Sequence, residues 1–386
     1  MKTAALCVLL GFLPALDQEA TAQNGGVFVA TGDMTTARSE HTATLLADGK
    51  VLITGGTGNR QAGLSSAELY DPSSGTFMPT SAMTTAHRRH TATRLPDGRV
   101  LIAGGSVGVS AELYDPETGT FTPTGNMLEA QDGHTATLLG NGEVLIAGGE
   151  LAQPPYPTAA KAELYDPATG TFRFAATYAD AKTSYSGGPS WAAATQLPDG
   201  KVLIVANNPA EIYDPEMNAF TLTGGMAAPR YRDDLWFYWH AIISLNDGSV
   251  LITGGNDEWD CPGIANADVY SPASATFIGA GSMIEPRMAH TATLLADGTV
   301  LVTGGGAGGC VSNNMDSSEI YDPATRSFIA AGRMTTRRSF HTATRLNDGR
   351  VLICGGDSYW PFTITRTAEL YIPNSSPPAR RRVIRH

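Results

Sequence analysis

The sequence predicts an all-β fold, a seven-bladed β-propeller, and two observations carry that prediction. The first is a segment, HTATLLADGKVLITGG from His41 to Gly56, that recurs along the chain with small changes. Further copies begin at His90, His134, His240, His290 and His341, and a degenerate copy lies between Trp191 and Asn207. The second is the acidic residue and Tyr-Asp-Pro turn that follow, as in Glu68 to Pro72. Seven such units near fifty residues long are typical of propellers.

The spacing of the units is regular. Their Asp-Gly or Asn-Gly turns begin at residues 48, 97, 141, 199, 247, 297 and 348, so the steps are 44 to 58 residues. Within one unit, residues 41–46 and 50–54 are short apolar runs joined by Ala-Asp-Gly, a strong hairpin signal. We expect them to be strands A and B. Residues 67–70 read as strand C, and Phe77 opens strand D after a turn, which completes a blade of four antiparallel strands.

The two ends of the repeat array complement each other. Residues 26–34, GVFVATGDM, resemble residues 75–83, GTFMPTSAM, so the array begins with a strand D that has no blade of its own. The last unit stops after its strand C, at residues 371–373. Pairing the two segments would give the last blade its fourth antiparallel strand. This would close the ring and leave no open sheet edge.

The chain divides into three predicted parts. Residues 1–22 read as a secretory signal peptide, with an apolar run too short to span a membrane and the cleavage site Ala20-Thr21-Ala22. The propeller follows over 23–373, and 374–386 is a basic, Pro-rich tail that we expect to be disordered. The net charge of -11 without a basic stripe argues against a nucleic-acid partner. We expect an exported, periplasmic or extracellular monomer.

The double glycine and the Tyr-Asp-Pro turn, repeated over residues 25–373, resemble the Kelch repeat family in its bacterial form, which is similar to the central propeller of galactose oxidase. The resemblance implies the fold and says little about function, because propellers carry many unrelated activities.

Residues that recur in almost every unit are expected to serve the scaffold. The histidines that open strand A are placed to bond neighbouring turns, and strands of different blades are too far apart for a metal ring. The same reasoning assigns to the scaffold the acidic strand C residues Glu68, Glu112, Glu163, Glu211, Asp268, Glu319 and Glu369. Methionines 34, 83, 127, 226, 283 and 334, with Tyr178 in the remaining unit, are expected to pack between blades.

Copper is a possibility that the galactose oxidase resemblance raises. In that family a Tyr-His pair at the start of one strand A supplies two copper ligands. The residues before the strand A histidines here are Glu40, Arg89, Gly133, Trp239, Ala289 and Phe340. None is Tyr, so the sequence predicts neither this copper site nor another metal or cofactor.

The repeat is broken at units four and five. Phe172 and Phe220 lie twenty residues before the strand A position, whereas the other strand D phenylalanines lie thirteen before it. Ala192 replaces the histidine of unit four, and Ala206-Asn207 replaces its double glycine. We therefore expect a depression near blades four and five, walled by aromatic and polar loop residues. The candidate ligand-binding residues are Trp191, Tyr231, Arg232, Asp233, Asp234, Trp236, Trp239, Asp257 and Trp259.

Two classes of function follow from these loops. The favoured one is a module that binds a glycan or a protein partner, with aromatic side chains for stacking and charged groups at the rim. The alternative is a sugar-modifying enzyme, to which the sialic acid mutarotases are the nearest Kelch analogy, with a copper radical oxidase disfavoured. The sequence fixes no catalytic acid or base.

The cysteines of the predicted mature chain fall into two groups. Cys354 stands at a strand B position and is expected to be a buried free thiol. Cys261 and Cys310 lie in equivalent loops of adjacent units, and for an exported protein we predict a disulfide between them.

Overall fold

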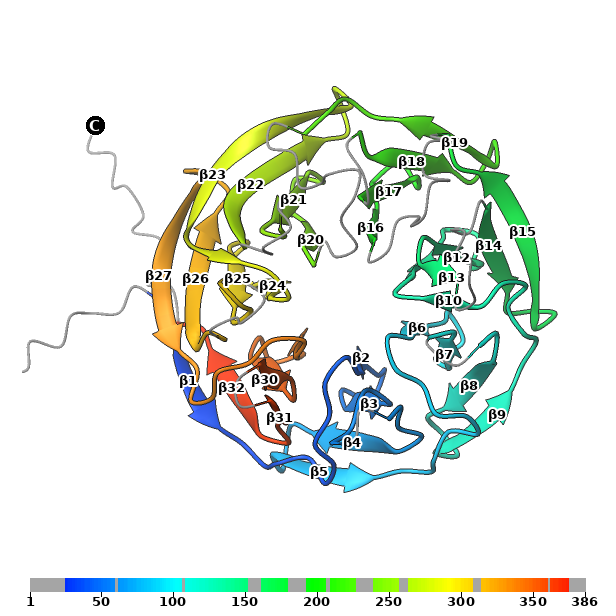
Figure 1. Cartoon of the computed structure of the whole chain (residues 1–386), viewed down its shortest axis with the longest axis horizontal. Coiled ribbons are helices and arrows are strands. Elements are labelled where there is room, and N and C mark those ends of the chain that lie inside the picture. The colour runs from blue at the N-terminus through cyan, green and yellow to red at the C-terminus, as the bar shows by residue number, and fades with distance from the viewer. Residues whose placement is uncertain are drawn as a thin grey trace, which may run out of the picture.

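The protein is a closed ring of seven four-stranded antiparallel sheets (Figure 1), which confirms the predicted β-propeller. The computed structural model describes residues 25–59, 62–105, 108–151, 161–179, 192–205, 209–226, 239–256, 263–307, 314–359 and 362–374. Within these residues the regular structure consists of strands only, and no helix long and apolar enough to cross a membrane is present.

Strands A and B are the inner strands of each blade. The A strands are β2 (Thr42–Leu45), β6 (Thr91–Arg94), β11 (Thr135–Leu138), β16 (Ala193–Gln196), β20 (Ala241–Ser244), β24 (Thr291–Leu294) and β28 (Thr342–Arg345). The B strands are β3 (Val51–Thr54), β7 (Val100–Ala103), β12 (Val144–Ala147), β17 (Val202–Val205), β21 (Val250–Thr253), β25 (Val300–Thr303) and β29 (Val351–Cys354). Every B strand is buried along its whole length because neighbouring blades cover both of its faces.

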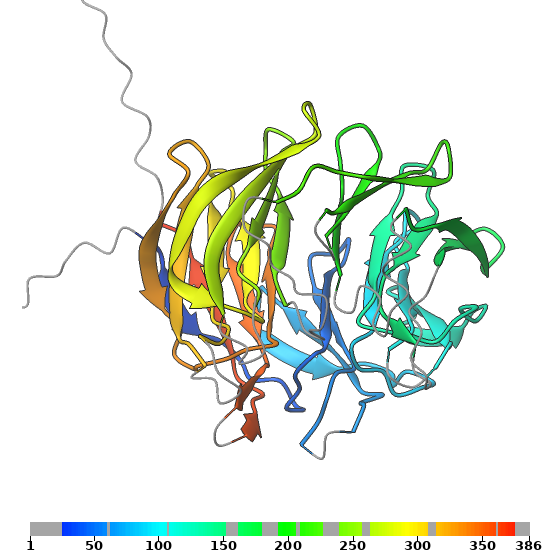
Figure 2. The same cartoon turned by 45° about the horizontal axis from the view of Figure 1, so that its top comes forward.

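Strands C and D form the outer half of each blade. The C strands are β4 (Ala67–Asp71), β8 (Ala111–Asp115), β14 (Lys161–Asp166), β18 (Glu211–Asp214), β22 (Ile264–Ser271), β26 (Ser317–Asp322) and β32 (Ala368–Ile372). The D strands are β5 (Thr76–Pro79), β9 (Thr120–Pro123), β15 (Thr171–Thr177), β19 (Ala219–Leu222), β23 (Thr276–Arg287), β27 (Ser327–Arg333) and β1 (Val27–Ala30). Two small ladders pair β10 (Gln131–Asp132) with β13 (Glu150–Leu151), and β30 (Asp357–Tyr359) with β31 (Phe362–Ile364). Figure 2 shows the β30–β31 hairpin projecting from one face of the ring.

The Asp-Gly turns fix the hairpins as the sequence predicts. The Asp48 carboxylate accepts the backbone N–H of Lys50 at 3.0 Å, and Gly49 has a φ of 86°, which an L side chain would disfavour. Between blades, the buried Met34 packs with residues of both the last and the first blade. The prediction that the recurring methionines pack between blades is confirmed there.

Ring closure occurs as predicted. Strand β1 pairs antiparallel with β32, from Val27 opposite Ile372 to Ala30 opposite Glu369, and Figure 1 shows the two ends of the chain meeting in one blade. The last blade therefore takes its outer strand from the start of the array. No edge strand remains unpaired at this seam.

Candidate functional site at the axis of the propeller

The residue immediately before each strand A histidine has an unusual backbone. These residues form what we call the axial ring, and their φ angles are positive: Glu40 53°, Arg89 55°, Gly133 69°, Trp239 31°, Ala289 53° and Phe340 51°. Only glycine adopts this left-handed region without cost, and for other residues the cost is about 1–2 kcal/mol. Such strain persists where the surroundings enforce it, and it is concentrated at functional sites.

Hydrogen bonds between blades enforce this conformation. Five of the six backbone N–H groups of the axial ring donate to the carbonyl of the ring member in the preceding blade. The pairs are Arg89 to Glu40 (3.2 Å), Gly133 to Arg89 (3.3 Å), Ala289 to Trp239 (3.0 Å), Phe340 to Ala289 (3.2 Å) and Glu40 to Phe340 (3.1 Å). The strained residues are therefore held from blade to blade around the axis.

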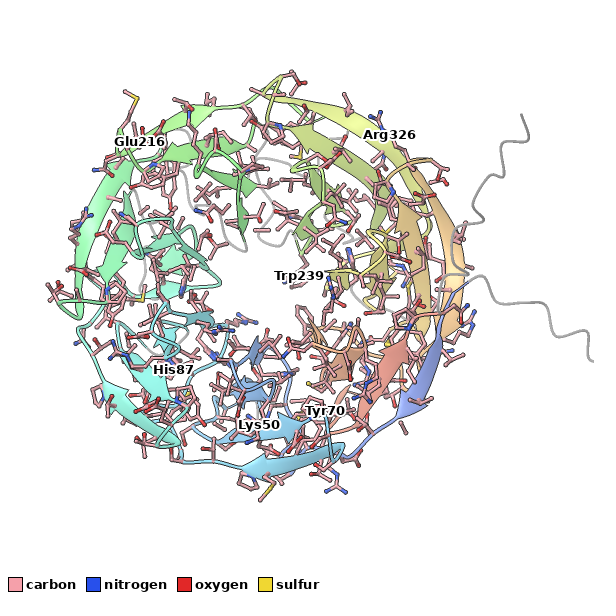
Figure 3. The ribbon with its side chains drawn as sticks, turned by 180° about the vertical axis from the view of Figure 1, so that it is seen from behind. Lys50, Tyr70, His87, Glu216, Trp239 and Arg326 are labelled. Atoms are coloured by element: carbon pink, nitrogen blue, oxygen red, sulfur yellow. The ribbon has the colours of Figure 1, made fainter. Side chains whose placement is uncertain are left out.

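The axial ring borders a hollow of about 290 Å³, which we call the axial hollow. Every blade contributes to its wall, with Ala192 standing for blade four. Figure 3 shows Trp239 at the inner edge of the ring of blades. The hollow is large enough for a small molecule of a few carbon atoms, and its wall is chemically uneven.

One arc of the wall, from blades one to three, is charged. The Glu40 carboxylate accepts the Nε–H of Arg89 at 2.7 Å through one oxygen and the Thr57 hydroxyl at 2.7 Å through the other. Arg89 also lies 3.5 Å from Asp132. Burial opposes the charge of Arg89, but the neighbouring carboxylates outweigh it and raise the guanidinium pKa. The side chains of Glu40 and Arg89 remain 11% and 30% exposed, so a ligand in the hollow can reach them.

The arc from blades five to seven is apolar. The rings of Trp239 and Phe340 meet edge to face, with centroids 5.1 Å apart and planes at 84°, beside the methyl group of Ala289. Such pairs are favourable and rigid. The axial hollow thus combines an edge-to-face aromatic pair with a carboxylate–guanidinium pair, and Phe340 and Glu40 are neighbours where the two arcs meet.

A second carboxylate lies behind the charged arc. Asp357 accepts the Ser339 hydroxyl at 2.8 Å, and the Asn314 amide donates to both Ser339 Oγ and the Asp357 carbonyl. Burial raises the pKa of Asp357 to about 6, the hydrogen bond from Ser339 opposes that rise, and the charge of Glu40 adds to it. A carboxyl group with a raised pKa therefore lies close enough to Glu40 to be affected by its charge.

The strand A histidines serve the scaffold, as predicted. For five of the six, the Nε2 atom lies within hydrogen-bonding distance of a threonine hydroxyl of the preceding blade: His41 with Thr342 (3.0 Å), His90 with Thr42 (3.0 Å), His134 with Thr91 (3.0 Å), His290 with Thr253 (2.9 Å) and His341 with Thr291 (3.2 Å). Burial lowers the pKa of His134 to about 4 and that of His341 to about 3, so these imidazoles are neutral.

The described residues do not match a copper site of the galactose oxidase type. The Nε2 atoms of His41 and His341 face threonine hydroxyls, and the axial ring contains no tyrosine. Among the residues that the structure describes, no three His, Cys, Asp or Glu side chains are grouped to hold a metal. We therefore derive no chemical step through copper.

Only one of the nine residues predicted from the loops can be placed. Trp239 lies on the wall of the axial hollow, and the depression expected near blades four and five stays a prediction. The others lie outside the described residues, namely Trp191, Tyr231, Arg232, Asp233, Asp234, Trp236, Asp257 and Trp259. The predicted disulfide partners Cys261 and Cys310 also lie outside them, whereas Cys354 is a buried free thiol, as predicted.

Sequence reasoning did not select Glu40, Arg89 or Asp357. A signal was present for the first two, because the position before the strand A histidine carries a different residue in every described unit. A variable position inside a nearly invariant segment indicates a function other than the scaffold. Asp357 carries no comparable signal, since it follows the last double glycine in a loop of ordinary composition.

The fold and the axial hollow define this protein as a seven-bladed β-propeller with a single described hollow bordered by all seven blades. No family model and no curated protein matches the chain. A solved structure with a similar fold is that of a novel fungal alcohol oxidase with catalytic diversity among the AA5 family, in complex with copper. It matches with a TM-score of 0.72 and 19% identity, over 91% of this chain and 76% of that chain.

This likeness shows the fold, and it also corrects the order of the two functions considered from the sequence. The preference for a binding module, on a glycan or a protein partner, was wrong against this comparison, because the solved protein with the similar propeller is an enzyme.

Proposed function

We propose that the protein is an enzyme that acts on a sugar or another small hydroxylated molecule in the axial hollow. The observation that carries the proposal is the Glu40 carboxylate, which stands on a strained backbone and is held by Arg89 and Thr57 at the wall of the hollow. A carboxylate fixed by two donors and still exposed to a ligand is suited to accept a proton from a hydroxyl group.

The shape of the site favours an uncharged substrate with one apolar face. Trp239 and Phe340 offer apolar aromatic surface for the C–H groups of a sugar ring, and Glu40 and Arg89 offer an acceptor and donors for its hydroxyls. Glu40 and Asp132 outnumber Arg89, so the arc carries a net negative charge that disfavours anionic substrates. Proton transfer at a hydroxyl is the step required to open or rearrange a sugar ring.

A second candidate is an alcohol oxidase, which the similarity to the fungal enzyme favours. The described axial ring does not supply the ligands of a galactose oxidase copper site, so this candidate would need an oxidant or a metal site provided by other residues. Oxygen consumption with primary alcohols and sugars separates the two candidates, because proton-transfer chemistry consumes no oxygen.

The test is a panel of sugars and alcohols, followed by NMR for isomerisation and by an oxygen electrode for oxidation. For an active substrate, Glu40→Gln should lower kcat by about 100-fold or more, because the amide keeps the shape and loses the base. Glu117→Gln, in an exposed turn, is the matched control and should retain full activity. Equal turnover by wild type and Glu40→Gln would assign the chemistry to other residues.

We also infer that the repeats are of the Kelch type and that the protein is exported as a monomer. The double-glycine repeats and the segment 1–22 support these two inferences. Mass spectrometry of the protein recovered outside the cytoplasm should give a chain that begins at Gln23, and an intact residue 1 would contradict export through this signal.

A further inference from the structure

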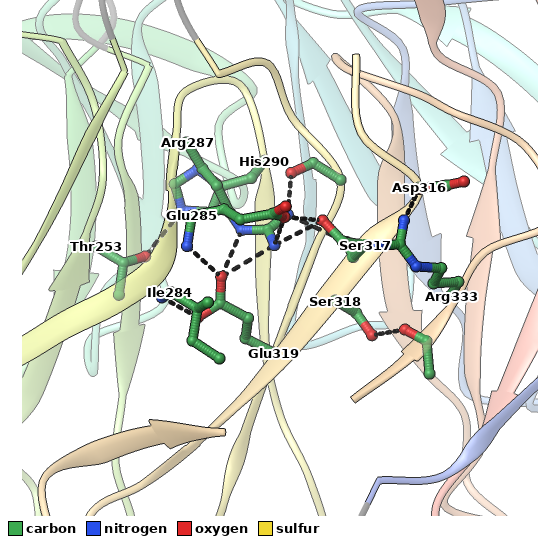
Figure 4. A network of polar contacts seen from close by, with 12 residues as sticks. Thr253, Ile284, Glu285, Arg287, His290, Asp316, Ser317, Ser318, Glu319 and Arg333 are labelled. Carbon is green, nitrogen blue, oxygen red and sulfur yellow. Dashed lines mark hydrogen bonds and ion pairs between the residues drawn. The ribbon is translucent and has the colours of Figure 1, made fainter. Parts of the chain in front are cut away.

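A buried charged cluster recurs in several blades where the chain passes from strand D to strand A, and in blade six it joins the end of β23 to Glu319 on β26 (Figure 4). The Arg287 guanidinium lies between two carboxylates, with NH2 3.0 Å from both Glu285 and Glu319. Its NH1 donates to the carbonyl of Gly304 at 2.8 Å. Arg287 and Glu319 are 0% and 2% exposed, so Arg287 neutralises a carboxylate that water cannot reach, whereas the Glu285 side chain is 41% exposed.

Other blades fill the same position, which we call the arginine slot, with a hydrogen-bond donor. The partners are Arg38 with Glu68 (2.8 Å), Arg338 with Glu369 (2.8 Å) and His87 with Glu112 (3.1 Å). Each donor also bonds the carbonyl of the first glycine of its pair: Arg38 to Gly55 (2.6 Å), Arg338 to Gly355 (2.8 Å) and His87 to Gly104 (2.7 Å). A donor between the carboxylate and this carbonyl is therefore a regular feature of these blades.

Blade three has the same acidic groups and no arginine. Gln131 precedes Glu163 by the same interval that separates Arg287 from Glu319, and Glu129 stands where Glu285 stands. The backbone places Gln131 in the slot, because its carbonyl accepts the N–H of Gly105 at 2.9 Å, as the Arg287 carbonyl accepts that of Gly255 at 2.9 Å.

The Gln131 side chain is buried without a partner. It is 0% exposed, and neither its amide nitrogen nor its amide oxygen has a hydrogen-bond partner among the described residues. An unpaired buried amide costs about 1–3 kcal/mol. A native protein therefore needs a group in the slot that satisfies this oxygen.

The carboxylate in this slot is also unusual. Glu163 is 0% exposed and accepts the backbone N–H groups of Leu128 and Glu129, both at 2.9 Å. Burial raises its pKa, the two backbone hydrogen bonds oppose that rise, and the charge of Glu129 raises the pKa further. In blade six the equivalent carboxylate, Glu319, pairs with Arg287 at 3.0 Å, and no ion pair to Glu163 is found among the described side chains.

We propose that blade three binds a hard metal cation of the calcium class in the arginine slot, held by the Gln131 amide oxygen and the carboxylates of Glu163 and Glu129. Calcium takes carboxylate, amide and carbonyl oxygens together with water. Glu129 is half-buried, which leaves a path for the ion and its waters. The Gly148 carbonyl, at the register position of the slot carbonyl in other blades, is a further ligand of the right chemistry.

The test compares the melting temperature of the full chain in EDTA and in excess CaCl₂ at equal ionic strength. Wild type should melt about 2 °C or more higher with calcium, because a ligand that binds only the folded state stabilises it. Gln131→Arg places a guanidinium in the slot, so this variant should have a high melting temperature in EDTA and should show no further increase with calcium. Arg287→Gln recreates the site between Glu285 and Glu319, so it should melt low in EDTA and gain a response.

Calcium content after dialysis gives a readout that does not depend on the stability of a variant. About one equivalent should remain with wild type and none with Gln131→Arg. Lys161 lies two residues before Glu163 on β14, and Lys161→Ser should keep the calcium response. The proposal is overturned if wild type melts equally in EDTA and calcium, if KCl has the same effect as CaCl₂, or if Lys161→Ser alone abolishes the response.

Discussion

The backbone N–H of Glu40 donates to the carbonyl of Phe340 at 3.1 Å, and this hydrogen bond joins the first blade to the last at the axis of the propeller. The same two blades are adjacent at the rim, where β1 completes the last blade by pairing with β32. The first and last blades are therefore joined both at the axis and at the outer rim of the ring. Because Glu40 is also a wall residue of the axial hollow, the geometry of the candidate site depends on closure.

Closure can be tested at one glycine. Gly26 donates its N–H to the Tyr371 hydroxyl at 2.9 Å, and a Cβ on Gly26 would lie 2.0 Å from the carbonyl oxygen of Ile372. Gly26→Ala should therefore lower the free energy of unfolding by about 2 kcal/mol or more. Gly279→Ala is the control, because a Cβ there meets no atom within 4 Å. Urea unfolding in which the two variants match would remove the steric argument for the seam.

The buried histidines predict a loss of stability in acid. The folded pKa values of about 4 for His134 and about 3 for His341 lie below the ordinary value of 6.5, so the unfolded state binds protons first. Their contribution is complete above about pH 6.5 and falls by about 1.4 kcal/mol per pH unit and per histidine as the pH drops toward 4.

Urea titrations at several pH values check this slope. His341→Gln should be less stable at pH 7 and should show a shallower loss between pH 6.5 and 4, because one proton-linked group is gone. A variant whose stability falls as steeply as that of wild type would show that His341 is not linked to folding in this way.

The buried ion pair of the last blade should tolerate joint replacement better than single replacement. Arg338 and Glu369 are both 0% exposed and 2.8 Å apart. Arg338→Met leaves the carboxylate buried without its cation and should cost about 3–5 kcal/mol. The double variant Arg338→Met with Glu369→Gln should recover a large part of that loss. Equal instability of the single and double variants, measured by urea unfolding, would indicate that packing dominates.

The reactivity of the Cys354 thiol tests whether this residue is buried in the folded protein. Burial raises the pKa of Cys354 to about 11, the Thr342 hydroxyl opposes that rise, and the thiol is 1% exposed. Iodoacetamide at pH 8 should leave Cys354 unmodified in the folded protein and alkylate it in urea. Rapid labelling of Cys354 in the folded protein would contradict its burial.

The Cys261–Cys310 disulfide stays a prediction, and non-reducing peptide mapping that finds both thiols alkylatable would exclude it.

The repeat pattern alone predicted the blades, the closure of the ring and the scaffold role of the recurring residues. Each of these is set by local chemistry: the Asp48–Gly49 turn fixes a hairpin, and the apolar run from Val51 to Thr54 requires cover on both faces. The predictions matched the structure because every copy of the unit carries the same kinds of turn and strand residues, and the ends of the array supply complementary strands.

The candidate site was decided by the tertiary structure. Glu40 and Arg89 stand 49 residues apart in the sequence, and Trp239 and Phe340 stand 101 apart, so no local pattern indicates that they share one hollow. Their side chains reach its wall because hydrogen bonds between blades hold their backbones in the left-handed region. Four of these five bonds join blades that are consecutive in the chain, and the fifth, from Glu40 to Phe340, forms only when the ring closes. The sequence therefore determined the blade, and closure determined the hollow.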